Sequence, residues 1–438
     1  MTFVHKIFVP GLLSLAVACG GGSARNPIAD TWPGGGKSDS SRIATILDFA
    51  WSGSVEVDGD VFDPNQTLEG LLYYTVGQLN GSRAVGRMDR VAWSNVATSS
   101  DGKRTTIRYQ ATMPVAWGSK TDLPERYTFK LPRRGDAFGD FTARYHDKCT
   151  DFTPDPKDPT HVVDVESMWY YYRPDREGCE IDDGDVIVSD ARVTLSADNT
   201  TGKYPEYDLV WKDGALKVVA IFGKYKKGEV EDDVGIDAYD TFNQAVRRRF
   251  RRMTGFATTP AGVPASPGAA VPEVDYTATL ADGRKIVVAA LLVDEVSSAT
   301  AEFYQRYEAL SVDADVIAYN GHAGLGANIR TLAGVGKFDR GQYTIIFMNG
   351  CDTYTYIDGA LAEKHAAINP DDPKGTKYMD MVVNAMPAFF MFDSASTMAI
   401  VDGLLAYDAP RTYDEIFESI STTQIVLVTG EQDNAFHP

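Results

Sequence analysis

Short apolar runs alternate with amphipathic segments in the second half of the chain, and this pattern restricts the fold more than any other feature. Leu216–Phe222 and Lys285–Val293 have the length and composition of buried strands. Ile236–Met253, which lies between them, has the spacing of an amphipathic helix. Strands that alternate with helices favour a mainly parallel sheet with helices on both faces. We therefore expect an α/β domain over residues 209–438.

The remaining segments of this domain follow the same alternation. A possible hairpin turned by Asp282-Gly283 joins Tyr276–Leu280 to the strand Lys285–Val293. A capping box at Thr412 predicts the start of a helix. Further expected helices are Ser298–Leu310, Thr353–Lys364, Met379–Met386, Thr397–Tyr407 and Thr412–Ser421, and the expected last strand is Ile425–Thr429.

Residues 42–208 lack the alternation of strand-like and helical segments that marks the second domain. They predict an α+β or β-rich module. Its expected helix is Leu68–Leu79, and Trp169–Tyr172 is interpreted as part of a β core rather than as a carbohydrate or peptide platform. The expected strands are Ile43–Trp51, Ser54–Val57, Thr105–Thr112, Arg126–Leu131, Phe141–Tyr145, Met168–Tyr172 and Asp185–Leu195. A boundary inside the loop Thr258–Pro272 is the alternative, but Ile236–Met253 makes a natural crossover helix and favours the earlier one.

The charge of the chain excludes some classes of partner. With 42 Lys+Arg against 61 Asp+Glu, the net charge of -19 disfavours nucleic-acid binding. The basic run Arg247–Arg252 is interpreted as the solvated end of an amphipathic helix. Asp182, Asp183 and Asp185 could supply oxygen ligands to a structural Ca²⁺, but the spacing is not that of an EF-hand and solvated turns are the preferred interpretation. We expect no cofactor and no metal centre.

The amino terminus predicts export. A short basic start and an apolar run form a secretory signal peptide over residues 1–19. The segment LAVACGGGS resembles a bacterial lipobox, which implies that Cys19 carries the lipid and that residues 20–41 form a flexible tether. The protein would then be lipid-anchored in the bacterial cell envelope, with the membrane as a partner through acylated Cys19. The alternative is an ordinary secreted protein in which this cysteine is coincidental.

The other three cysteines divide into a pair and a remainder. Cys149 and Cys179 lie in one loop-rich region and are expected to form a disulfide in an oxidising compartment. Cys351 is left unpaired. An unpaired thiol in an exported protein indicates either a reactive group or a small buried apolar residue.

Two strand-like runs place a histidine near this unpaired cysteine. Val316–Tyr319 and Tyr343–Met348 each end at an Asn-Gly pair, and they are followed by His322 and Cys351. Parallel strands bring their carboxyl ends to one edge of a sheet, where α/β proteins build ligand sites. A thiol beside an imidazole is the minimal apparatus of cysteine nucleophilic catalysis.

The segments VIAYNGHAG and YTIIFMNGC resemble the two site-bearing strands of the caspase-like fold, which is shared by caspases, legumain, clostripain, gingipain and separase. In that fold one core strand ends in a His followed closely by Gly, and the next ends in the catalytic Cys. The resemblance covers residues ~210–435 and implies a cysteine endopeptidase with a peptide or protein substrate. This chain departs from the pattern in having Ala323 directly after the histidine and in lacking the caspase signature around Cys351.

The resemblance also implies roles for individual residues. Cys351 would be the nucleophile and His322 its proton-transfer partner, and the backbone N–H groups of Cys351 and Gly324 would hold the oxyanion. Asp352, or the acidic stretch Glu229–Asp233, would line a substrate pocket. The competing hypothesis is a catalytically inactive surface lipoprotein that uses the same fold as a binding module. A serine hydrolase is disfavoured because no G-x-S-x-G motif is present.

Overall fold

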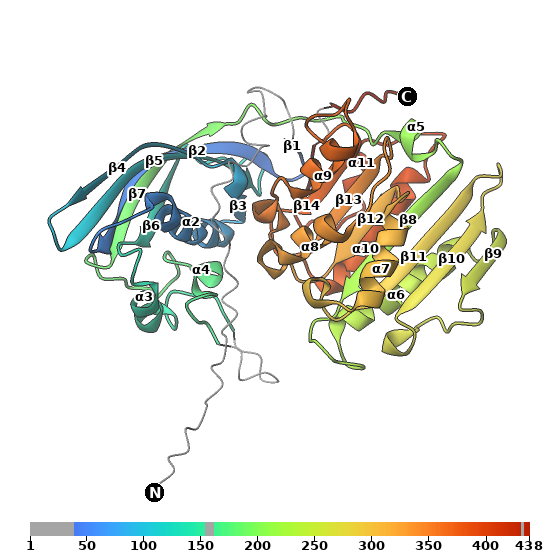
Figure 1. The fold of residues 1–438 in the computed structure, drawn as a ribbon, viewed down its shortest axis with the longest axis horizontal. Coiled ribbons are helices and arrows are strands. Elements are labelled where there is room, and N and C mark those ends of the chain that lie inside the picture. The colour runs from blue at the N-terminus through green and yellow to red at the C-terminus, as the bar shows by residue number, and fades with distance from the viewer. Residues whose placement is uncertain (1–38, 154–161, 431–432) are drawn as a thin grey trace, which may run out of the picture.

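The computed structural model describes residues 39–153, 162–430 and 433–438. They form two sheets that lie side by side, a six-stranded and a nine-stranded one, each with its own helices (Figure 1). The expected signal peptide, the lipid-accepting Cys19 and all but the last residues of the expected tether lie outside the described ranges. We call the part built on the six-stranded sheet the small module.

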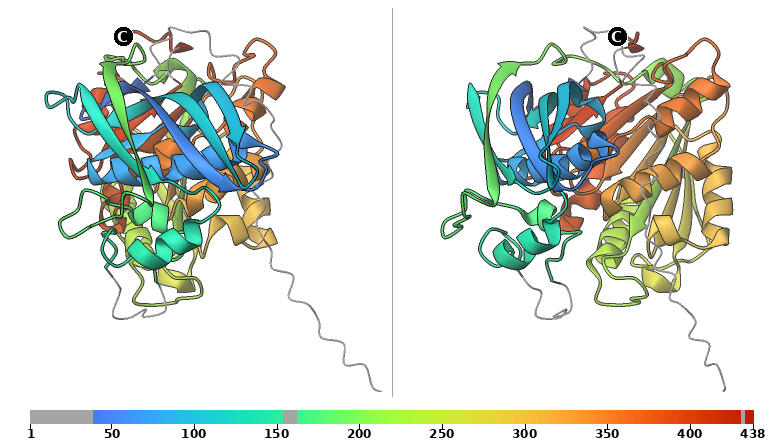
Figure 2. Two further views of the ribbon diagram at one scale, coloured as in Figure 1. Left: turned by 90° about the vertical axis from the view of Figure 1, so that its left-hand side faces the viewer. Right: turned by 60° about the vertical axis from the view of Figure 1, so that its left-hand side comes forward.

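The small module is an antiparallel sheet covered by helices on one side (Figure 2). Its strand order is β3-β5-β2-β7-β6, with β4 also paired to β5. Its strands are β2 (Thr45–Asp58), β3 (Ala84–Gly86), β4 (Ala92–Ser100), β5 (Arg104–Trp117), β6 (Arg126–Pro132) and β7 (Val186–Leu195). Its helices are α2 (Pro64–Gly81), the short 3-10 turn η1 (Met88–Arg90), α3 (Phe138–Tyr145) and α4 (Met168–Tyr171).

The nine-stranded sheet is parallel only at its centre. The order is β1-β15-β14-β13-β12-β8-β11-β10-β9, in which the five strands from β14 to β11 run parallel and the remaining pairings are antiparallel. The strands are β1 (Asp39–Ser40), β8 (Ala215–Gly223), β9 (Thr254–Thr259), β10 (Glu273–Thr279), β11 (Lys285–Val293), β12 (Val316–Asn320), β13 (Thr344–Asn349), β14 (Met379–Asn384) and β15 (Val426–Thr429). The expected mainly parallel sheet is therefore corrected to a mixed sheet, because tight turns and the chain ends add antiparallel strands at both edges.

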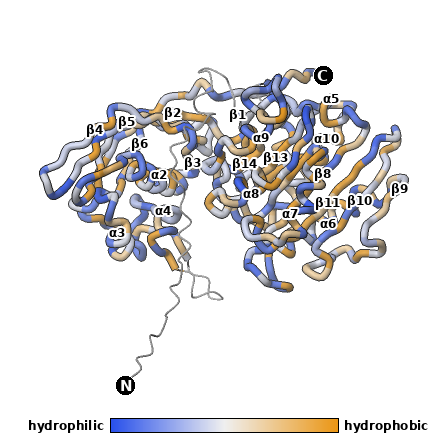
Figure 3. The backbone as a smooth tube through the Cα atoms, in the orientation of Figure 1, coloured by the Kyte–Doolittle hydropathy of each residue, from blue (hydrophilic) through white to orange (hydrophobic). Residues whose placement is uncertain are grey.

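Helices cover both faces of this sheet, as the sequence predicts. They are α5 (Tyr207–Val210), α6 (Val234–Phe250), α7 (Ala301–Ser311), α8 (Ala327–Val335), α9 (Ala360–Ile368), α10 (Phe390–Leu404) and α11 (Tyr413–Phe417), together with the short turns η2 (Gly268–Ala270), η3 (Val296–Ser298), η4 (Gly324–Gly326) and η5 (Thr353–Tyr356). Alternate residues of β8 face opposite sides. Val218 packs in the core with α6 and α10, whereas Val219 packs in the core with α7 and α8. The central strands accordingly contain apolar residues along most of their length (Figure 3).

Three segments have a different secondary structure from the one expected. Phe141–Tyr145 lies in α3 and Met168–Tyr172 contributes α4, although both were expected as strands. Met379–Met386 was expected as a helix and supplies strand β14. Every residue of β14 is buried, so its sequence lacks the alternation that marks a half-buried strand, and its methionines favour helices in isolation.

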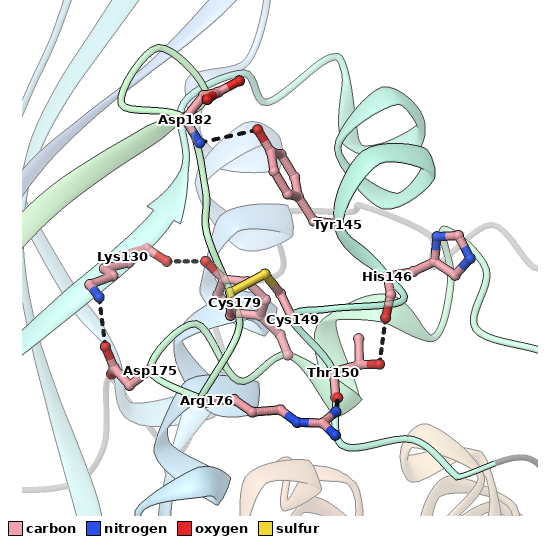
Figure 4. The surroundings of a disulfide bond; sticks show 10 residues. Lys130, Tyr145, His146, Cys149, Thr150, Asp175, Arg176, Cys179 and Asp182 are labelled. Atoms are coloured by element: carbon pink, nitrogen blue, oxygen red, sulfur yellow. Dashed lines mark hydrogen bonds and ion pairs between the residues drawn. A yellow bond between two sulfur atoms is a disulfide. The ribbon is translucent and has the colours of Figure 1, made fainter.

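The expected disulfide between Cys149 and Cys179 is present, with an S–S distance of 2.01 Å (Figure 4). Around it, the Tyr145 hydroxyl accepts a hydrogen bond from the Asp182 amide at 3.3 Å, and Lys130 forms an ion pair with Asp175 at 2.8 Å. The disulfide therefore joins the end of α3 to the chain that follows α4.

Strand β1 connects the start of the small module to the nine-stranded sheet. Asp39 and Ser40, which lie inside the expected tether, pair with β15 at the edge of that sheet. The buried Arg87 of the small module donates from Nη1 to the Thr429 hydroxyl of β15 at 3.2 Å, and the Tyr354 hydroxyl donates to the Asp39 carboxylate at 2.8 Å. Buried polar contacts and a shared strand pairing thus hold the two parts together.

Candidate active site

His322 and Cys351 follow neighbouring strands. β12 and β13 are adjacent and parallel, with Asn320 opposite Asn349. The Gly321 amide donates to the Asn349 carbonyl at 3.2 Å, so the two loops are already in contact where the strands end. The sequence predicts that the two residues lie at one edge of the sheet, and the strand order agrees with this prediction.

His322 is exposed and held from two sides. Its Nε2 lies 3.2 Å from the Tyr225 carbonyl oxygen, and its ring centroid lies 5.2 Å from that of Tyr225 and 5.3 Å from that of Phe390. The His322 carbonyl accepts hydrogen bonds from the Tyr319 hydroxyl and from the Asn328 side chain, each at 2.7 Å. The loop is therefore fixed by buried donors while the imidazole remains accessible to a substrate.

Cys351 is partly buried, and its sulfur faces a backbone carbonyl rather than His322. The thiol donates to the Ala388 carbonyl at 3.6 Å. Burial, and then the neighbouring Asp352 charge, raise the pKa of this thiol to about 12. Within the described chain no hydrogen bond joins the imidazole to the thiol. Near neutral pH the pair is consequently a neutral thiol beside an accessible histidine.

One segment contacts both residues. Ala388 accepts from the Cys351 thiol, and Phe390, two residues later, packs against the His322 ring. This segment leads from β14 into α10, so three parallel strands contribute to the same small region. Catalytic contacts often tighten only on substrate binding, and an open arrangement in the empty protein is compatible with catalysis.

The two loops contain left-handed backbone conformations. Leu325 and Asp352 each have a φ of 50°, which is uncommon for residues other than glycine. Such conformations cost about 1–3 kcal/mol each and cluster at functional sites. Gly324, at a φ of 58°, adopts the same conformation without the penalty of a Cβ. In the described part of the chain, the amides of Gly324 and Cys351 donate to no protein acceptor.

Asp352, which the sequence suggested as a pocket residue, is fully buried. Its carboxylate accepts a hydrogen bond from the Asn80 side chain of the small module at 2.8 Å. Burial raises its pKa to about 7. The carboxyl does not face an open pocket in this structure. The alternative stretch Glu229–Asp233 lies on the same loop as Tyr225, and its last residue, Asp233, is buried and caps α6.

A buried ladder of asparagines links the strand ends beneath the two loops. Asn320, Asn349 and Asn384 are the last residues of β12, β13 and β14 and are fully buried. The Asn349 amide donates to Asn320 at 2.9 Å and to Asp393 at 3.1 Å, and the Asn384 amide donates to Asn349 at 2.8 Å. Burial raises the pKa of Asp393 well above its ordinary value. This ladder fixes the relative positions of the His and Cys loops, and the sequence reasoning missed it.

Apolar side chains also surround the site, and the sequence reasoning missed these too. Tyr225, Leu325 and Phe389 are exposed on the segments that follow β8, β12 and β14, and Met391 is exposed in the first turn of α10. The rule that parallel strands bring their carboxyl ends together could have identified these loops, since each follows a strand-like run. The loop after β14 could not be identified in this way because β14 was expected as a helix.

The expected absence of a metal centre is not tested by a structure without ligands. Across the described ranges no group of three or more His, Cys, Asp or Glu side chains is arranged to hold a metal ion. In the acidic loop, Asp185 accepts hydrogen bonds from the Tyr145 hydroxyl at 2.6 Å and from Arg144.

Comparison with known proteins gives no relative: no protein-family model, no curated protein and no solved structure matches this chain. None of the helices in residues 39–153, 162–430 and 433–438 has the length and apolar character needed to cross a membrane.

Proposed function

We propose that this protein is an exported, lipid-anchored cysteine endopeptidase of the caspase-like fold that uses His322 and Cys351 as a dyad. The observation that carries the proposal is the placement of these residues directly after two adjacent parallel strands whose loops are in contact. The asparagine ladder, the left-handed loop residues and the unused amides of Gly324 and Cys351 support the same interpretation. The likeness to the caspase-like fold remains part of the proposal.

The chemistry would proceed through an acyl-enzyme. The Cys351 sulfur attacks the scissile carbonyl carbon while its proton passes to His322, and a C–S bond forms. The amides of Cys351 and Gly324 stabilise the negative charge on the carbonyl oxygen. Protonated His322 then gives its proton to the leaving amine as the C–N bond breaks. Water, deprotonated by the same imidazole, hydrolyses the thioester and restores the thiol.

The raised pKa of the Cys351 thiol requires that deprotonation accompany attack. A thiol with a pKa of about 12 is almost wholly protonated at neutral pH. His322 therefore acts as a general base at the moment of attack rather than as the partner of a preformed ion pair. Because the imidazole packs against Phe390 and the thiol donates to Ala388, substrate binding must bring the imidazole and the sulfur closer together.

The exposed apolar side chains favour a substrate with large apolar residues near the scissile bond. Tyr225, Leu325, Phe389 and Met391 offer contacts of this kind, whereas buried Asp352 offers none to a basic side chain. We therefore replace the charged pocket expected from the sequence with an apolar one in this proposal.

A thiol-reactive peptide probe tests the proposal directly. An acyloxymethyl ketone peptide with a large apolar residue before its reactive carbonyl should label the full-length protein at Cys351. Labelling should vanish in Cys351→Ala and fall strongly in His322→Ala, because the first removes the nucleophile and the second its base. A matched probe without the reactive group is the control. Equal labelling of a protein with an accessible Cys351 thiol and of its Cys351→Ala variant would contradict the proposal.

The competing function is a lipid-anchored binding protein without catalysis. It is favoured by the raised pKa of the partly buried thiol and by the missing hydrogen bond between His322 and Cys351. It predicts that no probe labels Cys351 even after the site has been uncovered, which separates it from the peptidase proposal.

The anchor itself is tested by fractionation. Cys19 is the proposed lipid-accepting residue, so Cys19→Ser should move the protein from the membrane fraction to the soluble fraction of cells. Ser23→Ala, in the same glycine-rich segment, is the matched control and should leave the protein in the membrane fraction. Equal membrane recovery of wild type and Cys19→Ser would remove the anchor from the proposal.

A further inference from the structure

A helix of the small module lies against the candidate nucleophile. α4 is on the side of the small module that faces the nine-stranded sheet (Figure 1). The hydroxyl of Tyr170, in α4, interacts with the Cys351 sulfur, and this interaction is one of the influences that lower the thiol pKa against the larger effect of burial. The Tyr171 ring packs edge-on against Tyr170 at 5.0 Å. A tyrosine that is distant in the sequence thus contacts the partly buried Cys351.

The helix is fixed firmly to α2. A Cβ at Gly77 would lie 1.7 Å from the Trp169 carbonyl oxygen, so the two helices touch at a position that only glycine allows. Arg173 donates from Nη1 to the Gly77 carbonyl at 2.6 Å and to the Tyr170 carbonyl at 3.0 Å. These contacts make α2 and α4 one packed unit.

The same unit also holds the loop that carries Cys351. Asn80, in the last turn of α2, donates to Asp352 at 2.8 Å. The disulfide lies at the other end of the unit, because the Arg173 amide donates to the Cys149 carbonyl at 2.8 Å. The Cys149–Cys179 bond, drawn in Figure 4, therefore closes the chain segment that contains Tyr170.

We propose that α4 is a built-in cap which keeps the candidate nucleophile latent, with Tyr170 as the residue that covers Cys351 and the disulfide as the staple that holds the cap in place. This inference rests on the proposed function for its biological meaning. Attack on a peptide requires the sulfur to come within about 3–3.5 Å of the carbonyl carbon, and a tyrosine side chain that is hydrogen-bonded to the sulfur obstructs that approach. Activation then requires displacement of α4 relative to the Cys351 loop.

The expected test measures access to the thiol rather than catalysis. The folded full-length protein, without reductant, is treated with iodoacetamide, and alkylation of Cys351 is followed by mass spectrometry. Wild type should react slowly. Tyr170→Ala should react at least tenfold faster, whereas Tyr170→Phe should stay within a few-fold of wild type because the ring remains. Tyr407→Ala, at an exposed tyrosine in the turn after α10, is the matched truncation control and should react like wild type.

A second variant tests the staple. The double replacement Cys149→Ser with Cys179→Ser should also speed alkylation of Cys351, even where Tyr170→Ala does not yield folded protein. Equal alkylation rates for wild type and whichever of these two variants is folded, judged by circular dichroism, would overturn the cap.

Peptide cleavage by the same variants separates the cap from the proposed function. Faster alkylation together with new cleavage supports both. Faster alkylation without cleavage supports the cap and counts against the peptidase. Unchanged alkylation in a protein that already cleaves peptides would retain the peptidase and overturn the cap.

Discussion

At the scale of one residue, Asp352 has a structural environment that does not fit the role suggested by its position in the sequence. It directly follows Cys351, so an acidic specificity pocket was a natural hypothesis. The structure instead buries the carboxyl fully, with hydrogen bonds to the side chains of Asn80 and Tyr170. Burial raises its pKa to about 7 because the charged form loses hydration that its hydrogen bonds to Asn80 and Tyr170 do not replace.

The pH dependence of this residue follows from the direction of the shift. The folded protein binds the Asp352 proton more tightly than the unfolded chain does, so between pH 4 and pH 7 the unfolded state releases it first. Stability associated with this group is therefore complete below about pH 4 and is lost as the pH rises toward 7. Asp352→Asn keeps an acceptor for Asn80 and tolerates the left-handed backbone. It should gain stability relative to wild type from pH 4 to pH 7, by at most about 4 kcal/mol.

Urea unfolding of wild type and Asp352→Asn at several pH values checks this expectation. Asp371→Asn, at an exposed carboxylate whose pKa is lowered by its hydrogen bonds with Lys377 and Tyr378, is a control with the opposite sign. A stability difference between wild type and Asp352→Asn that does not change with pH would show that the carboxyl is not buried as described.

At the scale of single elements, the sequence predicted the strands that position the site but not the cap above them. The runs before His322 and Cys351 are apolar and end at Asn-Gly, so both strands could be predicted from the sequence. Met168–Tyr172 was expected as a strand because aromatic residues favour strands, yet five residues are too few to show a periodicity. Its contact with Cys351 joins positions far apart in the chain, and no local pattern encodes such a contact.

The packing of α4 on α2 predicts that replacing Gly77 by alanine lowers stability, which is the opposite of the usual effect in a helix. Alanine at a helix interior usually stabilises relative to glycine by about 0.5–1 kcal/mol. At Gly77 the added methyl would meet the Trp169 carbonyl, so Gly77→Ala should instead destabilise the protein by about 1–3 kcal/mol through overpacking. Gly334→Ala in α8, where a Cβ meets nothing within 4 Å, is the matched control and should stabilise. Thermal unfolding measures both, and a stabilising Gly77→Ala would contradict the close approach.

At the scale of the whole molecule, alternation of strands and helices predicted an α/β domain with helices on both faces, and the structure confirms these features. It did not predict how the small module attaches. β1 adds two residues to the edge of the nine-stranded sheet, and the buried Arg87 of the small module donates to Thr429 in β15. Both features depend on residues that look like an ordinary tether or a loop in the sequence. Together with α2 and α4, they make the small module a structural part of the candidate site.

The most direct test of the account is cleavage of an unfolded protein substrate by four full-length forms. These are wild type, Tyr170→Ala, Tyr170→Ala with Cys351→Ala, and Tyr170→Ala with His322→Ala. We expect little cleavage by wild type and rapid cleavage by Tyr170→Ala. Adding Cys351→Ala should abolish that activity, and adding His322→Ala should lower kcat by about 10²–10⁴, the usual contribution of general acid–base catalysis. Undiminished cleavage by the form that lacks Cys351, or no cleavage by any form in which alkylation shows the thiol uncovered, would contradict the His322–Cys351 dyad.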